Sequence, residues 1–347
     1  MRILYGVQGT GNGHIARARA MAKAFQSLPV EIDFVFSGRE RDKYFSMDEF
    51  GDFRTLKGVS FVSKQGAIDH VETLRRNDLQ QLWRDITSLE VSKYDLVLND
   101  FEPVTAWAAK RSDVPCLSIS HQNAFRYSVP VRGANMIDKS LIRYFAPADH
   151  HLALHWYHFD QPILPPIIQP ELGQVDSQDF ILVYLPFEGF EEIIDLLIRF
   201  NQYEFVCFHP EVSEDMDIEN IRCRPLSYDR FQHALHECNG VIANGGFELP
   251  SEALSLGKKL LLKPLTGQFE QMSNVATLEM LGLATSMDRL DSLLVGRWLE
   301  DKTAEKVSYP DVAQAIADWI LEGNLHDYSS LQRELWSQVD FPEYATV

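Results

Sequence analysis

Short apolar runs alternate with amphipathic stretches along the first 160 residues. Five runs have the length and residue types of β-strands: 3–7, 32–36, 96–98, 116–119 and 151–154. The stretches between them have the spacing of helices: 15–26, 68–89, 104–111 and 135–145. Strands that alternate with helices indicate right-handed βαβ crossovers and a parallel sheet.

A proline-rich segment interrupts this pattern, and the alternation then starts again. Pro162, Pro165, Pro166 and Pro170 make the segment unsuitable for a helix or a central strand. The second set of strands is predicted at 180–185, 204–208, 240–243, 259–262 and near Ala284. The second set of helices is predicted at 191–200, 228–237, 251–256, 268–281 and 310–321, and a last helix at 329–339 lies outside the alternation.

These patterns predict an α/β protein with two Rossmann-like domains whose parallel sheets face each other across a cleft. We assign residues 1–160 to the first domain, 161–178 to the linker, 179–323 to the second domain and 324–347 to a tail helix. The tail helix can return to the first domain.

Composition excludes several classes of function. The 347 residues carry a formal net charge of −18, which argues against nucleic acid as a partner. The sequence has no apolar run long enough to span a membrane, and its first residues lack the features of a signal peptide. Its four cysteines are scattered, as expected for structural thiols in a reducing compartment. We therefore expect a cytoplasmic protein.

A glycine loop follows the first predicted strand and ends at a histidine. Gly9, Gly11 and Gly13 precede His14, which stands where the dinucleotide-binding motif requires its third glycine. The second strand ends in Ser37, not in the acid that holds an adenosine ribose, and no Walker lysine follows the loop. The loop therefore presents a histidine at the start of a helix, at the sheet edge where α/β proteins bind ligands.

His14 is a candidate general base, because imidazole titrates near neutral pH and takes up a proton from a hydroxyl. Asp100 follows another strand at the same edge and can orient the histidine. The alternatives are that His14 packs against its helix and that Asp100 caps the helix after Pro103. Asn99 and Glu102 compete with Asp100 for either role.

A second group of glycines and carboxylates lies in the C-terminal part. Asn244, Gly245 and Gly246 end a strand, and Glu252 lies in the helix that follows. Backbone amides at a helix N-terminus bind phosphate, and carboxylates accept hydrogen bonds from ribose and sugar hydroxyls. The order of these groups indicates a sugar-nucleotide site. The alternative for the two glycines is a tight turn that requires positive φ angles.

Three motifs resemble one family of enzymes. The loop from Gly9 to His14 is similar to that of the MurG-type N-acetylglucosaminyltransferases, and 120–123 is similar to their H-E-Q-N segment. The stretch 244–274 resembles the donor site of the UDP-glycosyltransferases. This resemblance implies a GT-B fold and an inverting, metal-independent transferase that needs no cofactor besides a nucleotide sugar, with UDP as the expected nucleotide.

The resemblance also implies a role for each matching residue. His14 would be the base, and Asp100 would orient it. Donor-binding residues would be Gly11, Gly13, Asn244, Gly245, Gly246, Phe247, Glu252, Glu270 and Gln271. Gln122 and Asn123 would lie on the acceptor side.

The sequence departs from the family pattern at two donor positions. Asn244 replaces a histidine that lies near the pyrophosphate in many relatives, which leaves more charge for the amides, the helix dipole and Arg222 or Arg224 to compensate. Glu270 replaces a shorter aspartate, so the identity of the transferred sugar stays open.

Two other functions fit the same sequence. A UDP-sugar 2-epimerase would share the fold and the donor site, and a non-catalytic sugar-nucleotide-binding protein would bind UDP without transfer. The acceptor can be a glycan, a lipid-linked sugar or a small molecule. The basic and aromatic segment 125–145 leaves peripheral contact with the inner membrane face open, against the alternative of a loop packed on its domain.

Overall fold

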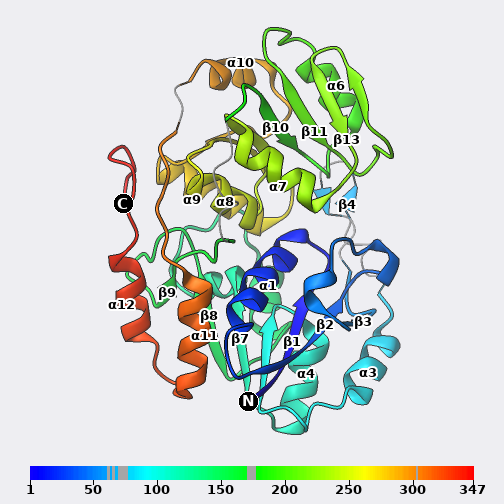
Figure 1. Ribbon diagram of the computed structural model, residues 1–347, viewed down its shortest axis with the longest axis vertical. Helices are drawn as coiled ribbons and strands as arrows, with labels where there is room; N and C mark the ends of the chain where they lie inside the picture. Colours follow the sequence, from blue (N-terminus) through cyan, green and yellow to red (C-terminus); the bar gives the residue numbers. More distant parts are fainter. Residues whose placement is uncertain (61–62, 65–66, 69–76, 170–176, 302–303) are drawn as a thin grey trace.

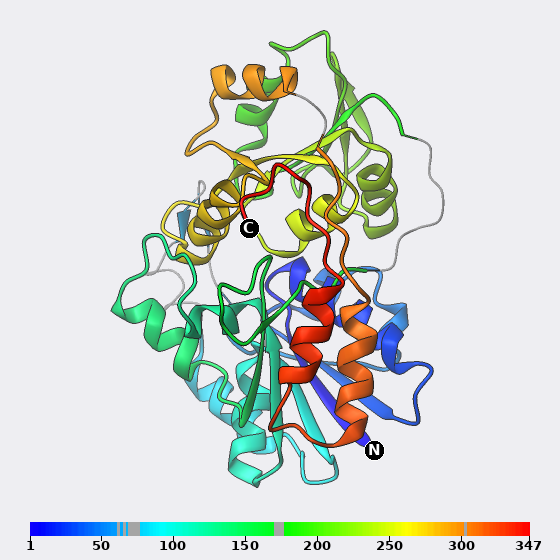
Figure 2. The same ribbon diagram turned by 90° about the vertical axis from the view of Figure 1, so that its left-hand side faces the viewer.

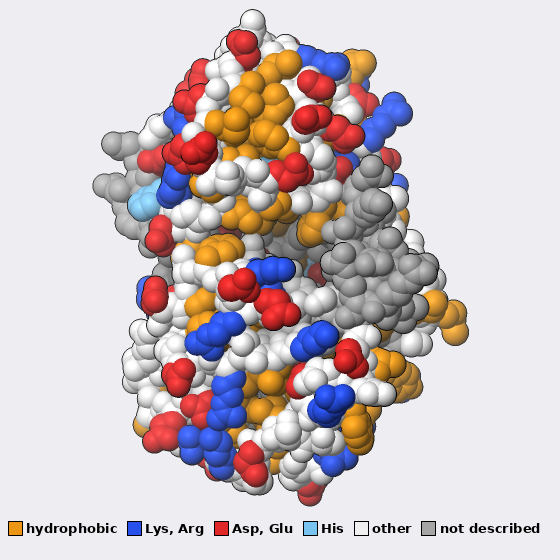
Figure 3. Space-filling view, turned by 90° about the vertical axis from the view of Figure 1, so that its right-hand side faces the viewer, with side chains coloured by type: hydrophobic (Ala, Val, Ile, Leu, Met, Phe, Trp, Pro, Cys, Tyr) orange, Lys and Arg blue, Asp and Glu red, His pale blue; other side chains and the backbone are white. Residues whose placement is uncertain are grey.

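The structure is a computed structural model that describes residues 1–60, 63–64, 67–68, 77–169, 177–301 and 304–347. Two sheets of seven strands each form two lobes, one below the other in Figure 1. We call the lobe that contains the N-terminus the first lobe and the other the second lobe. The face drawn in Figure 3 is indented where the lobes meet.

The first sheet is entirely parallel. Its strands are, in spatial order, β3 (Arg54–Leu56), β2 (Glu31–Ser37), β1 (Arg2–Gln8), β6 (Leu96–Asp100), β7 (Cys116–Ser120), β8 (His150–Leu154) and β9 (Ile163–Leu164). The chain order reverses between β1 and β6, and ligands of open α/β sheets bind at such a switch point. The loops after these two strands therefore define the expected site in this lobe.

Helices and short turns surround the first sheet. They are α1 (Asn12–Phe25), α3 (Leu79–Ser88), α4 (Pro103–Ser112), α5 (Met136–Tyr144) and the 3₁₀ turns η1 (Arg41–Lys43), η2 (Asp48–Phe50) and η3 (His121–Arg126). β4 (Ser63–Lys64) and β5 (Ala67–Ile68) pair as a small antiparallel sheet. Alanines at 18, 20, 22 and 24 favour helix and let α1 pack closely, so nearly all of its second half is buried.

The second sheet repeats this plan and has one antiparallel pair, β12 with β13. Its spatial order is β12 (Met216–Ile218), β13 (Ile221–Arg224), β11 (Phe205–Phe208), β10 (Ile181–Tyr184), β14 (Gly240–Asn244), β15 (Lys259–Lys263) and β16 (Thr285–Ser286). The helices of this lobe are α6 (Phe190–Leu197), α7 (Tyr228–Glu237), α8 (Glu248–Ser255), α9 (Phe269–Met280) and α10 (Ser292–Glu300). The switch point lies between β10 and β14, so the loop after β14 faces the cleft.

Most predicted elements are confirmed. Helix α10 was not predicted from the sequence, although Asp291 caps it and several of its apolar residues are buried. Two missed strands have weak signals. β13 buries only Ile221 and Cys223, which alternate with two arginines, and β3 has three residues. The helix predicted from residue 68 is present from Leu79, whereas Ile68 lies in β5 and 69–76 fall outside the described residues.

The segment predicted as the linker begins with a strand. Ile163 and Leu164 form β9, which pairs with β8 at the edge of the first sheet. An edge strand tolerates flanking prolines because one of its sides makes no ladder hydrogen bonds. Residues 170–176 of the predicted linker fall outside the described residues.

The chain returns to the first lobe one helix earlier than the sequence pattern suggests. α11 (Val312–Glu322), which the prediction places in the second domain, lies against α1, and α12 (Ser329–Ser337) lies beside α11 and β9 (Figure 2). The indole N–H of Trp336 donates to the carbonyl oxygen of Ile163 at 2.7 Å. The last two helices thus tie the end of the chain to the first lobe.

Candidate active site between the two lobes

The structure brings together the two residues predicted to be catalytic. His14 lies in the first turn of α1, and Asp100 ends β6, the neighbour of β1 in the sheet. Nδ1 of His14 is 2.8 Å from Oδ1 of Asp100. Asp100 is fully buried, whereas the His14 side chain is 15% exposed. The carboxylate accepts the Nδ1 hydrogen, which leaves Nε2 as the nitrogen that can receive a proton.

The alternative role of Asp100 as a helix cap is excluded by Glu102. The Glu102 carboxylate accepts from the backbone N–H groups of Val104 and Thr105 at 2.8 and 2.6 Å, so it is the cap of α4. The Asn99 amide donates to the carbonyl oxygen of Glu102 at 2.7 Å and stabilises the same turn. Asp100 is therefore available to the histidine.

Arg17 holds Asp100 in its charged form. It lies one turn after His14 on α1, and its Nε and Nη2 donate to the two carboxylate oxygens at 2.7 and 2.8 Å. Burial alone raises the pKa of Asp100, but Arg17 and His14 outweigh burial and lower it. An ionised Asp100 stabilises the imidazolium that forms when His14 accepts a proton.

The same arginine also binds a carboxylate of the second lobe. Nη1 of Arg17 donates to Glu248, which lies in the first turn of α8. Burial raises the pKa of Glu248 to about 8. Arg17 opposes this rise, and the negative charge of Asp100 adds to it. Arg17 and Glu248 were not among the predicted site residues. The spacing of three residues between His14 and Arg17, which places both on one helix face, was the available signal.

Gly11 and Gly13 shape the start of α1. Gly11 precedes the helix in an extended conformation. A Cβ atom on Gly13 would lie 3.0 Å from Cγ of Glu248, so this glycine allows α1 to approach α8. Both predicted residues therefore position the first turn of α1 against the second lobe.

The turn between β14 and α8 presents backbone amides. Neither Gly245 nor Gly246 has a positive φ angle, which excludes the turn alternative. A Cβ atom on Gly245 would lie 2.9 Å from the carbonyl oxygen of Gln271, whereas one on Gly246 would meet open space. Among the described residues, no side chain caps α8. The Gly246 N–H donates to the Asn244 carbonyl oxygen at 2.9 Å and Pro250 has no N–H, so the N–H groups of Glu248 and Leu249 are the ones in the first turn that an anion can bind.

Phe247 and Asn244 contribute mainly to the framework of this turn. The Phe247 ring stacks on His121 with centroids 3.9 Å apart and is nearly buried between the lobes, so only its backbone can face a donor. The Asn244 amide donates to the carbonyl oxygen of Lys263 at 2.9 Å, and its buried Oδ1 has no hydrogen-bond partner among the described residues.

The two arginines considered as phosphate ligands do not line the pocket beside α8. Arg224 binds Asp217 at 2.7 Å, and Arg222 lies over the Phe180 ring, with 5.4 Å between its Cζ and the ring centroid. Both lie on β13, three strands away from β14 in the sheet order. The positive charge that compensates the donor pyrophosphate near Asn244 must therefore come from another residue.

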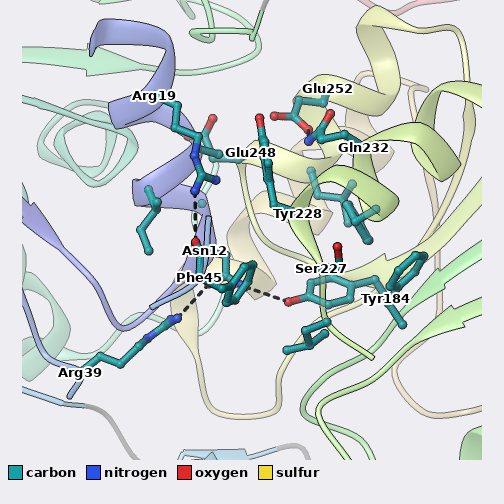
Figure 4. A pocket seen from close by; sticks show the side chains of 17 residues that line it. Asn12, Arg19, Arg39, Phe45, Tyr184, Ser227, Tyr228, Gln232, Glu248 and Glu252 are labelled. Carbon is teal, nitrogen blue, oxygen red and sulfur yellow. Dashed lines mark hydrogen bonds between the residues drawn. The ribbon is translucent and has the colours of Figure 1, made fainter. Parts of the chain in front are cut away.

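Glu252 lies in a pocket formed by both lobes (Figure 4). Its carboxylate accepts from the Gln232 amide at 3.1 Å, and burial raises its pKa to about 7. Aromatic rings of Phe45, Tyr184, Phe208, Tyr228 and Phe231 also line the pocket. A carboxylate, an amide and aromatic faces suit a ribose and a base.

The predicted sugar and acceptor residues fall into two groups. The Gln122 amide lies 3.1 Å from both oxygens of Glu270, so this pair spans the two lobes beside the cleft. Gln271 accepts from the backbone N–H of Leu265 at 2.8 Å, and the Asn123 amide donates to Ser118 and Leu152 at 3.0 Å. The side chains of Gln271 and Asn123 are buried and hydrogen-bonded within their own lobes. In this structure they stabilise the loops around the site.

A comparison with protein families shows to which family the chain belongs. The sequence model of the glycosyl transferase family 1 matches residues 1–301. The chain belongs to this family. No curated protein matches the chain. The family assignment supports glycosyl transfer as the reaction.

Solved structures share the fold of this family 1 member. The Streptomyces sp. SF2575 glycosyltransferase SsfS6 complexed with thymidine diphosphate has a TM-score of 0.59 at 13% identity, over 93% of this chain and 99% of that chain. MurG of Acinetobacter baumannii has a TM-score of 0.53 at 15% identity, over 92% of this chain and 99% of that one. The expected GT-B fold is confirmed.

Proposed function

We propose that this family 1 member transfers a sugar from a nucleoside-diphosphate donor to an acceptor hydroxyl with inversion, and that His14 is the general base. The observation that carries the proposal is the His14–Asp100 contact of 2.8 Å beside the uncapped start of α8. A base that is oriented by a carboxylate and lies next to an anion site is the arrangement this reaction requires.

Each step can be assigned to a group in the cleft. Nε2 of His14 takes the proton of the acceptor hydroxyl, whose oxygen forms a bond with the anomeric carbon. The bond from that carbon to the diphosphate breaks, and its electron pair stays on the diphosphate oxygen. Asp100 stabilises the imidazolium, and the α8 amides stabilise the leaving group. The sugar lies near Glu270, and the ribose binds Glu252.

We infer that the donor nucleotide is UDP and that the reaction needs no further cofactor. Glu252 and Gln232 lie 3.1 Å apart and suit the ribose hydroxyls, and the aromatic rings of the same pocket suit a pyrimidine. Solved structures of similar fold are complexes with thymidine diphosphate, whose base has the same ring carbonyls as uracil.

We infer that the first lobe carries the acceptor and contacts an anionic membrane surface through α5. Met136, Ile137 and Tyr144 are 80%, 70% and 62% exposed on this helix. Arg132 and three other basic residues belong to the same segment, which has a single acid, Asp138. Exposed apolar side chains beside basic ones are typical of interfacial helices. No described helix is long and apolar enough to cross a membrane.

Incubation with sugar nucleotides and a panel of acceptors tests the proposed reaction. We expect release of UDP that depends on an acceptor, and NMR of the product should show an inverted anomeric centre. His14→Ala should reduce turnover about 10²- to 10⁴-fold without changing UDP affinity. His326→Ala, between α11 and α12, is the matched control.

The outcomes separate the three functions considered for this chain. Epimerised sugar formed without an acceptor would show a 2-epimerase. UDP binding with no turnover on any acceptor would show a binding protein. Full turnover by His14→Ala would contradict the assignment of the base.

A further inference from the structure

The pocket between the lobes is lined by four charged side chains, and three of them have evident partners. Glu248 is bound by Arg17, and Glu252 accepts from Gln232. Arg19 donates to Glu49 and lies over the Tyr228 ring, with 4.0 Å between its Cζ and the ring centroid. The fourth is Arg39, and among the described residues no carboxylate pairs with it.

Arg39 reaches the pocket from the edge of the first sheet. It follows β2 and Gly38, whose φ of 96° turns the chain toward the cleft. Its Nη1 donates to Oδ1 of Asn12 and its Nη2 to the carbonyl oxygen of Thr10, both at 3.1 Å. Both partners are neutral, so they fix the direction of the guanidinium without compensating its charge (Figure 4).

The surroundings of Arg39 favour an anionic ligand. Burial lowers the pKa of its guanidinium, and the hydroxyls of Tyr44 and Tyr184 only partly offset the effect of burial. A cation withdrawn from water without a counter-ion costs free energy, which a bound anion recovers. The guanidinium has five N–H donors, so several stay available.

Asn12 connects Arg39 to the second lobe by hydrogen bonds. Its Nδ2 donates to the Tyr184 hydroxyl at 3.3 Å, while its Oδ1 accepts from Arg39. Tyr184 ends β10, next to the strand that leads to α8. The guanidinium is therefore held on the side of the cleft that faces the nucleotide pocket.

We propose that Arg39 binds the diphosphate of the sugar-nucleotide donor and supplies the positive charge that the second lobe lacks at Asn244. This inference rests on the proposed function and adds a ligand from the first lobe. The donor and the closed cleft then stabilise each other, because one lobe provides the amides and the other the cation.

Three basic residues of the second lobe are less suited to this role, because carboxylates already neutralise them. Lys263 binds Glu188 at 2.7 Å, and Arg230 binds Asp215 at 2.8 Å. Arg224 binds Asp217 at 2.7 Å. A diphosphate would have to displace a carboxylate from each of these cations, whereas Arg39 needs no such exchange.

Calorimetry of UDP, UMP and uridine with the wild type and Arg39→Gln tests this inference. We expect Arg39→Gln to weaken UDP binding about tenfold or more, as for the loss of a charged hydrogen bond. Uridine affinity should change less than about twofold, because uridine lacks phosphate. Arg39→Lys should lose less UDP affinity than Arg39→Gln. Arg41→Gln is the control, since Arg41 binds the Phe53 carbonyl oxygen outside the pocket.

A salt titration of the wild type and of Arg39→Gln gives a second, independent measurement. UDP affinity should fall as NaCl rises, and more steeply than in Arg39→Gln, because screening weakens the contact between guanidinium and phosphate. Unchanged UDP affinity in Arg39→Gln would overturn the inference and leave the proposed function intact. Equal losses for UDP and uridine would also overturn it. A wild type that binds no nucleoside diphosphate would refute the proposed function as well.

Discussion

Arg17 donates a hydrogen bond to Glu248 across the cleft, directly beside the predicted base. Arg17 comes from α1 of the first lobe and Glu248 from the first turn of α8 in the second. Because the same guanidinium also holds Asp100, closure of the cleft and orientation of His14 depend on one side chain. The catalytic group and the donor site are therefore coupled in this closed arrangement.

Arg17→Met should destabilise the protein by about 3–5 kcal/mol, because it leaves a buried carboxylate without a counter-charge. Urea unfolding at neutral pH measures this loss. Asp100→Asn removes the charge that Arg17 compensates, so the double variant should lose clearly less than the sum of the two single variants. Additive losses would show that the two side chains do not interact.

Asp100→Asn should reduce turnover by about 10²–10⁴-fold, because the amide no longer stabilises the imidazolium and can favour the wrong tautomer. UDP affinity measured by calorimetry should stay the same, since Asp100 lies beneath the base and not in the donor pocket. Asp113→Asn is the control: Asp113 ends α4 with a φ of 55°, a conformation that asparagine accepts. A loss of UDP affinity equal to the loss of turnover would contradict the orienting role.

The pairing of His14 with Asp100 could be predicted from sequence, because both follow strands whose carboxyl ends meet at one sheet edge. The contact between Arg17 and Glu248 could not, since it depends on how two separately folded lobes approach each other. The family resemblance implied ligand contacts for Asn123 and Gln271. In the structure the Asn123 amide donates to the Leu152 carbonyl oxygen, and the Gln271 amide oxygen accepts from the Leu265 N–H. Polar residues after a strand have the same pattern whether they face the cleft or the core.

The same reasoning explains why Arg39 was overlooked. The sequence shows only that Ser37-Gly38 replaces the acid of a dinucleotide-binding site. Whether the next arginine has a carboxylate partner depends on contacts with Thr10 and Asn12, which only the folded loop reveals.

UDP affinity should fall as pH rises through about 8, the pKa of Glu248. Below this pH the carboxyl is largely protonated, and above it a negative charge faces the diphosphate near α8. Glu248→Gln should bind UDP with much less dependence on pH between about 7 and 9. Calorimetry at several pH values measures both profiles, and an equal decline in wild type and variant would assign the effect to another group.

The raised pKa of Glu248 also affects folding stability. The unfolded glutamate loses its proton near 4.5, whereas the folded one keeps it up to about 8. The folded state therefore binds more protons in this window, and stability declines as pH rises through it. Thermal unfolding should show a smaller decline for Glu248→Gln, and parallel profiles for both proteins would contradict the assignment.

Ile137→Glu should weaken binding to vesicles that contain anionic lipid, because it places a charge on the exposed apolar side of α5. Co-sedimentation measures the bound fraction, which should fall severalfold while UDP affinity is unchanged. Leu79→Glu on α3 is the matched control, since Leu79 is 73% exposed on a different helix. Equal effects of both substitutions, or no binding by the wild type, would refute membrane contact through α5.

Gly245→Ala and Gly246→Ala should have different effects, the first mainly on folding stability and the second mainly on UDP binding. Gly245→Ala should cost about 1–3 kcal/mol of stability, because its Cβ would lie 2.9 Å from the Gln271 carbonyl oxygen and push α9 away. Gly246→Ala should change stability by no more than about 0.5 kcal/mol, because its Cβ meets open space and its φ is not positive. Gly246→Ala should instead weaken UDP binding, since a methyl group on this turn obstructs the approach of the diphosphate to the amides. Urea unfolding and calorimetry on both variants measure the two effects, and a Gly246→Ala protein with unchanged UDP affinity would place the diphosphate away from this turn.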